Sequence, residues 1–249
     1  MSVFLPSRQD RRDRHRGSVK RLGIIGGTGP ESTIDYYRSI VGLYRERQPD
    51  GSYPPVLINS IDLKRVFDLV GGGELDRLAD YLFDELERLV RAGAEYAAFA
   101  ANMPHIVFDA VERRVSIPLV SIVRATLDAA SQRGFKRLAI LGTRFTKGRF
   151  YSDVFAQGGI SLIAPNDHDL SFVHDRYVNE MVKGVFLPET RERILDVIHR
   201  LKTDHAIEGA VLAGTELPLL LRDHNTTGAD LLDTTQIHVA AIVDAMFEA

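Results

Sequence analysis

The sequence predicts an α/β protein made of two pseudo-symmetric, doubly wound lobes, each with a parallel sheet, and a cleft between them. An internal repeat supports this prediction. The segment Lys20–Gly26 reappears as Lys136–Gly142, 116 residues later, and Gly93–Ala100 matches Ala206–Ala213 at an offset of 113 residues. Two matches at nearly the same offset indicate one structural unit that occurs twice.

The four matched segments have the pattern of strands that are buried on both faces of a sheet. Each is a short apolar run that follows polar residues and ends in small ones. Between them, residues 75–92 and 190–201 place their apolar side chains on one helical face. Strands that alternate with helices predict right-handed crossovers and parallel sheets. A last helix over 235–247 is expected to fold back onto the first lobe.

These elements divide the chain into a tail and two lobes. We expect residues 1–19 to form an N-terminal tail, 20–123 plus 226–249 to form lobe 1, and 124–225 to form lobe 2. The tail carries five arginines between Arg8 and Arg16, and no apolar stretch follows them. A signal peptide needs an apolar region of roughly 7–15 residues. We therefore expect a solvated tail or, alternatively, an arm that contacts another subunit.

Composition excludes several classes of function. The net charge of −3, from 31 basic and 34 acidic residues, gives no electrostatic reason to bind nucleic acid or an anionic membrane. Apolar runs are much shorter than the roughly 20 residues of a transmembrane helix. The chain has no cysteine, which excludes disulfides, thiol nucleophiles and thiolate metal sites. The prediction is a cytoplasmic protein without nucleic-acid or membrane partners.

No metal site is predicted either. Residues 167–174 contain Asp167, His168, Asp169 and His174, but these side chains lack the spacing of a metal site. A polar loop is the expected structure of this stretch.

The fold predicts where a ligand binds. In open α/β sheets, ligands lie beyond the carboxyl ends of the strands. Two facing lobes would bring four such ends around one cleft, namely residues 26–33, 101–105, 143–147 and 214–216.

The residues at these ends include polar groups suited to a small anion. The glycine-rich loop 26–33 precedes a helix expected to start near Ile34, and its backbone N–H and hydroxyl groups suit a carboxylate or phosphate. Its glycine spacing fits neither a Walker A loop nor a dinucleotide fingerprint. Capping of that helix by its Ser or Thr is the alternative. The predicted substrate-binding residues are Gly27, Thr28, Ser32, Thr33, Asn102, Thr143, Thr146 and Thr215.

Three titratable residues near the strand ends are candidate acid–base groups: Glu216, His105 and Lys147. A cation in the 143–147 loop would favour an anionic substrate. Each candidate has a structural alternative. His105 could make a structural hydrogen bond, Glu216 could complement a helix N-terminus, and Lys147 could be solvated. Asp62 and Asp233 are weaker candidates.

Several motifs resemble the aspartate/glutamate racemase superfamily. They are Gly-Gly-Thr-Gly-Pro-Glu-Ser-Thr at 26–33 with Tyr36-Tyr37, Asn-Met-Pro-His at 102–105, Leu-Gly-Thr-Arg-Phe-Thr at 141–146, Gly-Thr-Glu at 214–216, and Asp-Thr-Thr-Gln-Ile-His at 233–238. The resemblance runs from about Lys20 to the C-terminus. It implies a cofactor-independent enzyme and a homodimer.

The resemblance also implies a mechanism that this chain lacks the groups to perform. Members of the superfamily deprotonate an amino acid's α-carbon with one cysteine and reprotonate it from the opposite face with another. In this sequence those positions are Ala101 and Gly214, and the family's threonine after asparagine is Met103. Neither a methyl group nor a hydrogen can transfer a proton, and each lost acid–base group typically costs about 10²–10⁴-fold in rate.

We therefore expect a branch of the superfamily that lacks both catalytic cysteines, naturally rather than through engineering. The predicted function is that of an aspartate/glutamate racemase-like enzyme, an isomerase or lyase, that acts on a small amino-acid-like carboxylate without the two-thiol mechanism. The alternative is a catalytically silent homologue that binds or senses a carboxylate.

Overall fold

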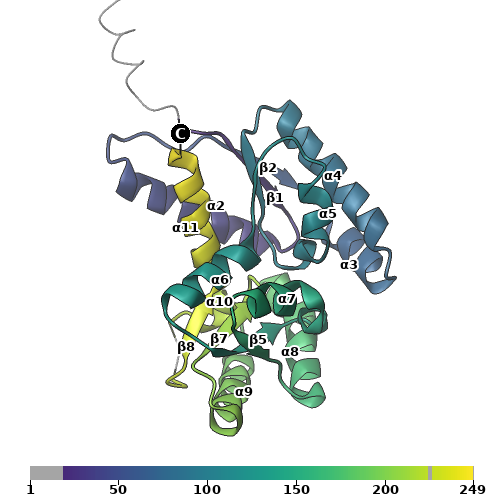
Figure 1. Cartoon of the computed structure of the whole chain (residues 1–249), viewed down its shortest axis with the longest axis vertical. Coiled ribbons are helices and arrows are strands. Elements are labelled where there is room, and N and C mark those ends of the chain that lie inside the picture. The colour runs from purple at the N-terminus through teal and green to yellow at the C-terminus, as the bar shows by residue number, and fades with distance from the viewer. Residues whose placement is uncertain (1–18, 224–225, 249) are drawn as a thin grey trace, which may run out of the picture.

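The computed structural model describes residues 19–223 and 226–248, which form two lobes, each around a four-stranded sheet (Figure 1). The strand orders are β2–β1–β3–β4 and β6–β5–β7–β8, and every pairing is parallel. The strands are β1 (Leu22–Gly26), β2 (Val56–Ser60), β3 (Tyr96–Phe99), β4 (Leu119–Val120), β5 (Arg137–Gly142), β6 (Ser161–Ile163), β7 (Gly209–Ala213) and β8 (Asp230–Asp233). The repeated segments are thus the paired central strands, as predicted. The arginine-rich stretch lies outside the described residues.

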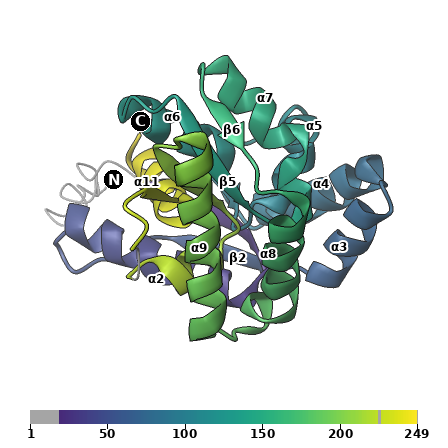
Figure 2. The same ribbon diagram turned by 90° about the horizontal axis from the view of Figure 1, so that it is seen from below.

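Helices cover both faces of each sheet (Figure 2). The first sheet lies between α2 (Pro30–Arg47) with α11 (Thr234–Phe247) and the group α3 (Leu63–Gly71), α4 (Leu75–Arg91) and α5 (Phe108–Glu112). The second lies between α6 (Ile122–Gln132) with α7 (Arg149–Gln157) and the group α8 (Asp167–Asn179), α9 (Pro188–His205) and α10 (Leu217–Leu221). Three short 3₁₀ turns, η1 (Met103–Val107), η2 (Arg144–Lys147) and η3 (Met181–Lys183), complete the described chain.

The two lobes exchange one helix each. Helix α6 follows β4 of the first sheet, yet Ile122 and Val123 pack with strands of the second sheet. Helix α11 follows β8 of the second sheet, and its Val239 and Ile242 pack with β1 and α2 of the first lobe. The chain therefore crosses between the lobes twice.

This exchange changes the lobe boundary expected from the sequence, which placed 226–249 entirely in lobe 1. Helix α11 does pack on the first lobe, but β8 pairs with β7 in the second sheet. A four-residue strand with an aspartate at each end has little apolar pattern, so its partner is decided by tertiary pairing.

Two local predictions were wrong. Helix α2 begins at Pro30 instead of near Ile34, because proline has no N–H to satisfy and its fixed φ suits the first helical turn. The stretch that begins at Asp167 is the first turn of α8, not a loop. Asn166 caps this helix by accepting a hydrogen bond from the Asp169 N–H at 2.9 Å. Among the described residues, no helix has the length and apolarity to cross a membrane.

Candidate functional site

The strand ends of the two lobes meet around a small cavity, as predicted. Thr28 follows β1, Ala101 and Asn102 follow β3, Thr143 follows β5, and Ala213 ends β7. The other lining residues are Leu63, Phe67, Met103, Phe145, Thr146, Phe150, Tyr177 and Val182. The cavity measures about 20 Å³, which is room for about one water molecule. A substrate can therefore enter only after the surrounding segments move apart.

Thr28 is the polar group of this cavity without a partner. The residue is 7% exposed, and its Oγ1 makes no hydrogen bond to any described residue. Buried hydroxyl groups in native proteins almost always have a partner, and an unmade bond costs roughly 1–3 kcal/mol. A water molecule or a ligand oxygen in the cavity would satisfy this hydroxyl.

Asn102 is held from both lobes. Its Oδ1 accepts a hydrogen bond from the Tyr151 hydroxyl of α7 at 2.5 Å. Its Nδ2 lies 3.5 Å from Thr234 Oγ1, and that hydroxyl donates to the Leu212 carbonyl of β7 at 2.8 Å. The amide is therefore positioned by its neighbours before any ligand arrives.

The glycine loop is closed by its own threonine. Gly27 N–H donates to Thr33 Oγ1 at 2.9 Å, and this hydroxyl donates to the Gly29 carbonyl at 3.1 Å. Gly27 has a φ of 83°, and a Cβ there would lie 2.4 Å from the Ile61 carbonyl. Gly27 and Thr33 therefore shape the loop and do not line the cavity. In the second lobe Thr146 Oγ1 donates to the Thr143 carbonyl at 2.7 Å, which closes the η2 turn.

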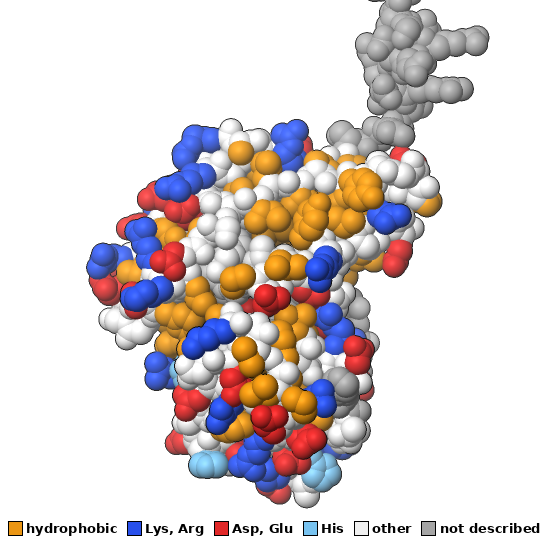
Figure 3. Space-filling model, turned by 180° about the vertical axis from the view of Figure 1, so that it is seen from behind, with side chains coloured by type: hydrophobic (Ala, Val, Ile, Leu, Met, Phe, Trp, Pro, Cys, Tyr) orange, Lys and Arg blue, Asp and Glu red, His pale blue; other side chains and the backbone are white. Residues whose placement is uncertain are grey.

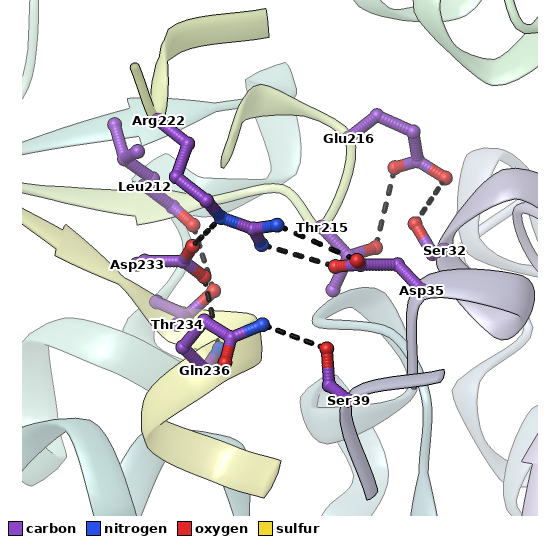
Figure 4. Close-up of polar contacts among 10 residues, drawn as sticks. All are labelled: Ser32, Asp35, Ser39, Leu212, Thr215, Glu216, Arg222, Asp233, Thr234 and Gln236. Carbon is purple, nitrogen blue, oxygen red and sulfur yellow. Dashed lines mark hydrogen bonds and ion pairs between the residues drawn. The ribbon is translucent and has the colours of Figure 1, made fainter. Parts of the chain in front are cut away.

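Glu216 is completely buried and joins the two lobes (Figure 4). One carboxyl oxygen accepts a hydrogen bond from Ser32 Oγ of α2 at 2.6 Å. The other accepts from the Tyr177 hydroxyl and from Thr215 Oγ1, the latter at 3.2 Å. Burial raises the pKa of Glu216, and the hydroxyl donors offset this only in part. A Cβ at Gly29, whose φ is 144°, would lie 1.9 Å from Glu216 Oε1, so this carboxyl requires a glycine opposite.

Tyr177 of α8 occupies the space beside Gly214. A Cβ at position 214 would lie 2.5 Å from Tyr177 Cε2 and 3.0 Å from Cζ. The phenol ring therefore occupies the space that a side chain at position 214 would need. Tyr177 also lines the cavity, and burial followed by the Glu216 charge raises its pKa well above the usual range. Sequence reasoning missed this residue because it lies 37 positions before Gly214. The available signal in the sequence was Gly214, because a residue without a side chain leaves room for a side chain from another part of the chain.

His105 has a structural role. Its Nδ1 donates to the Ala101 carbonyl, and its Nε2 accepts from the Ile122 N–H, each at 3.1 Å. Burial lowers its pKa to about 3, so the ring is neutral with both nitrogens occupied. It does not line the cavity with Ala101.

The remaining acid–base candidates also lie outside the cavity lining. Lys147 is exposed and forms an ion pair with Asp167. Asp62 caps α3 by accepting from Lys64 N–H at 2.8 Å, and Asp233 caps α11. Among the described residues, none that lines the cavity carries a charge. Residues 19–223 and 226–248 also contain no group of three His, Asp or Glu side chains arranged to hold a metal ion.

A second polar contact ties α2 to the end of β8 (Figure 4). Arg222 donates to Asp233 at 2.8 Å and to Asp35 of α2 at 3.0 Å. Gln236 Nε2 donates to Ser39 Oγ at 2.8 Å. Together with Glu216, these contacts fix α2 against the second lobe.

This fold and this site define a class. The family model for Asp/Glu/Hydantoin racemase matches residues 25–242, and the chain belongs to this family. The chain is 35% identical to an aspartate racemase homologue from Pyrococcus horikoshii, with a TM-score of 0.78 over 92% of this chain and 100% of that one. It is 23% identical to the broad specificity amino-acid racemase RacX of Bacillus subtilis over 225 residues, 86% of this chain and 92% of the relative. The aspartate racemase of Picrophilus torridus shares the fold, with a TM-score of 0.72 at 20% identity, over 91% of this chain and 94% of that one.

Within this family the chain is a cysteine-free member. The positions that the family resemblance assigns to the two thiols carry only the methyl group of Ala101 and the hydrogen of Gly214. Of the eight predicted binding residues, Thr28, Asn102, Thr143 and Thr146 line the cavity, whereas Gly27, Ser32, Thr33 and Thr215 support the residues around it.

Proposed function

We propose that this protein is an aspartate/glutamate racemase-like enzyme, an isomerase or lyase, that acts on a small amino-acid-like carboxylate without a two-thiol mechanism. The observation that carries the proposal is the buried, unpartnered hydroxyl of Thr28 in a cavity between the lobes. Asn102 and Thr143 line the same cavity and supply further neutral hydrogen-bonding groups. Such a set of donors suits one carboxylate.

The rest of the lining favours a substrate with one carboxylate and an apolar substituent. Besides Ala101 and Ala213, six large apolar side chains line the cavity, and no charged residue stands among the described lining residues. A second carboxylate in this cavity would lose its hydration without gaining a cation, which is costly. The apolar side chains are Leu63, Phe67, Met103, Phe145, Phe150 and Val182.

A silent carboxylate-binding homologue is the second candidate. Ala101 and Met103 leave the first lobe's side of the cavity without any acid–base group. Binding without turnover would be consistent with this arrangement.

The proposal is tested with pure protein and the L- and D-forms of alanine, leucine, aspartate and glutamate. Mass spectrometry detects products, and the melting temperature detects binding. We expect the alanine and leucine enantiomers to raise the melting temperature more than the dicarboxylic acids do. Products, or α-deuteration when the panel is incubated in deuterated water, support the enzyme, whereas stabilisation with neither supports the silent homologue. If no compound changes the melting temperature or is converted, the proposal is wrong.

The Thr28→Val variant tests the binding residue directly. Replacing an unpartnered buried hydroxyl with a methyl group should leave the ligand-free protein as stable or up to about 1 kcal/mol more stable. The same change should abolish stabilisation by the ligand. Thr203→Val is the control, because it removes an exposed hydroxyl of α9 that donates to the His199 carbonyl one turn earlier in the same helix. A Thr28→Val protein that still responds to ligand would contradict the assignment.

Two further expectations stay predictions: a cytoplasmic location and a homodimer without a cofactor. Several large apolar side chains are exposed in the first lobe, including Ile34, Tyr37, Tyr53 and Ile58. Figure 3 shows apolar side chains gathered over the upper lobe on one face of the molecule. Light scattering would establish the oligomeric state.

A further inference from the structure

We propose that the phenolic oxygen of Tyr177, coupled to the carboxyl group of Glu216, is the acid–base group of this site, and that it serves one face of the substrate only. This inference rests on the proposed function and narrows it: proton transfer on one face alone does not invert the α-carbon, so of the two proposed reaction classes it retains the lyase and excludes the isomerase. It names the catalytic residue and the stereochemical outcome, neither of which follows from the family resemblance.

Tyr177 lies beside Gly214 and lines the cavity. The Tyr177 ring carbon that bears the hydroxyl lies 3.0 Å from where a Cβ at position 214 would be. The phenol therefore stands where the side chain of the second thiol would begin. Among the described residues that line the cavity, Tyr177 is the titratable one. His105 and Lys147 are committed to other partners.

The phenol of Tyr177 has a proton acceptor in the carboxyl group of Glu216. A phenol with a raised pKa does not become a free phenolate near neutral pH, so it acts as a base only when its own proton has somewhere to go. The Tyr177 hydroxyl donates to Glu216 Oε2 in a buried, direct hydrogen bond. Burial raises the pKa of Glu216 and so makes its carboxylate a better proton acceptor than an exposed one.

The step balances as a two-proton transfer. The C–H bond at the substrate's α-carbon breaks, and its proton forms an O–H bond with the Tyr177 oxygen. The original phenolic O–H bond breaks, and that proton forms an O–H bond with Glu216. The electron pair of the C–H bond moves into the substrate's carboxylate as an enediolate, beside the donors on Thr28 and Asn102. The reverse transfers return a proton to carbon.

The opposite side of the cavity determines the stereochemistry. Ala101 and Met103 line the cavity from the strand end of the first lobe, across from the lobe that carries Tyr177, and neither can donate a proton. The proton therefore returns to the face from which it left. In deuterated water the chain should replace the α-hydrogen by deuterium and leave the configuration unchanged, because Glu216 also bonds to the exchangeable hydroxyls of Ser32 and Thr215.

The experiment follows α-deuteration by NMR and enantiomer composition by chiral chromatography, using the alanine, leucine, aspartate and glutamate enantiomers. We expect the wild type to deuterate one enantiomer of a bound compound with retained configuration. Tyr177→Phe should lower the deuteration rate by about 10²–10⁴-fold and keep ligand-induced stabilisation. Glu216→Gln should lower it similarly, and it keeps a side chain of the same shape if the tyrosine variant does not fold.

Tyr96→Phe is the control, because it removes another buried phenolic hydroxyl, bonded to the Ile242 carbonyl and away from the cavity. Its deuteration rate should stay within a factor of two of the wild type. A wild type that forms product while Tyr177→Phe is equally active overturns the inference and leaves the proposed function standing. Wild-type racemisation of the substrate also overturns it. A wild type that neither deuterates nor converts any compound overturns both.

Discussion

The two strand ends that follow β3 and β7 are equivalent in the repeat but differ in structure. At Ala101 the position is filled only by a methyl group, and the neighbouring His105 is neutral and bonded to backbone on both sides. At Gly214 the ring of Tyr177 occupies the vacated volume and reaches the buried carboxyl of Glu216. Neither strand end carries a thiol, yet one presents a methyl group and the other lies beside a phenol that is hydrogen-bonded to a carboxyl group.

The difference arises from what each lobe can place beside its strand end. In the second lobe, α8 places Tyr177 beside Gly214, and Glu216 lies two residues after this glycine in the loop that follows β7. In the first lobe, the η1 turn places Met103 in the cavity and turns His105 toward α6. The site is therefore asymmetric although the fold is pseudo-symmetric.

Placing cysteines at positions 101 and 214 is expected to have the largest effect on this asymmetry. The triple variant Ala101→Cys, Gly214→Cys, Tyr177→Ala should racemise a bound amino acid at least about 10²-fold faster than the wild type, because two acid–base groups then face opposite sides. The double variant that keeps Tyr177 should stay near the wild-type rate, since the phenol lies 2.5 Å from the new Cβ. Circular dichroism must first show that both fold. Equal racemisation by the two variants would show that Tyr177 does not occupy the thiol's place.

Gly29→Ala tests how rigidly the carboxyl group of Glu216 is held in place. The added methyl group would lie 1.9 Å from Glu216 Oε1, at a φ of 144° that side chains rarely adopt, and should cost about 3 kcal/mol or more of unfolding free energy. Urea denaturation measures this.

The matched control for that variant is Gly42→Ala, in the exposed middle of α2, where nothing lies within 4 Å of the new Cβ. It should gain about 0.5–1 kcal/mol. A Gly29→Ala protein as stable as this control would mean that Glu216 can move freely.

His105, near Ala101, and Glu216, near Gly214, should make the free energy of unfolding depend on pH in opposite directions. Burial lowers the pKa of His105 to about 3, from an ordinary 6.5, so the unfolded chain binds the proton first. Stability should therefore fall as pH decreases from 6.5, by up to about 1.4 kcal/mol per pH unit for each such histidine, and His238, with a pKa of about 4, adds to this. Glu216 has a raised pKa, so its contribution is complete below 4.5 and is lost as pH rises through its folded pKa.

Measurements of the unfolding free energy at several pH values check this pH dependence. His105→Gln should flatten the acid slope, and Glu216→Gln should flatten the loss toward higher pH. The control is His199→Gln, which replaces an exposed histidine on α9. An unchanged acid slope in His105→Gln would contradict the buried, neutral assignment.

Much of the fold was predictable because its signals are local. The repeated apolar segments became β1, β3, β5 and β7, and the periodic stretch at 75–92 became α4. The strand ends converge on one cavity because parallel strands share a carboxyl edge. The helix exchange between the lobes and the partner of β8 were not predictable in detail, because packing and not periodicity selects them.

The sequence by itself determined the family, the two-lobed repeat and the absence of both thiols, because motifs, periodicity and composition are properties of the chain. Only the tertiary structure decided which side chains lie beside Ala101 and Gly214, the positions that the family resemblance assigns to the thiols. Whether the space beside Gly214 is empty or is occupied by the Tyr177 ring depends on how distant parts of the chain pack together. Likewise, whether His105 and Glu216 titrate near neutral pH depends on burial and hydrogen bonds that exist only after folding.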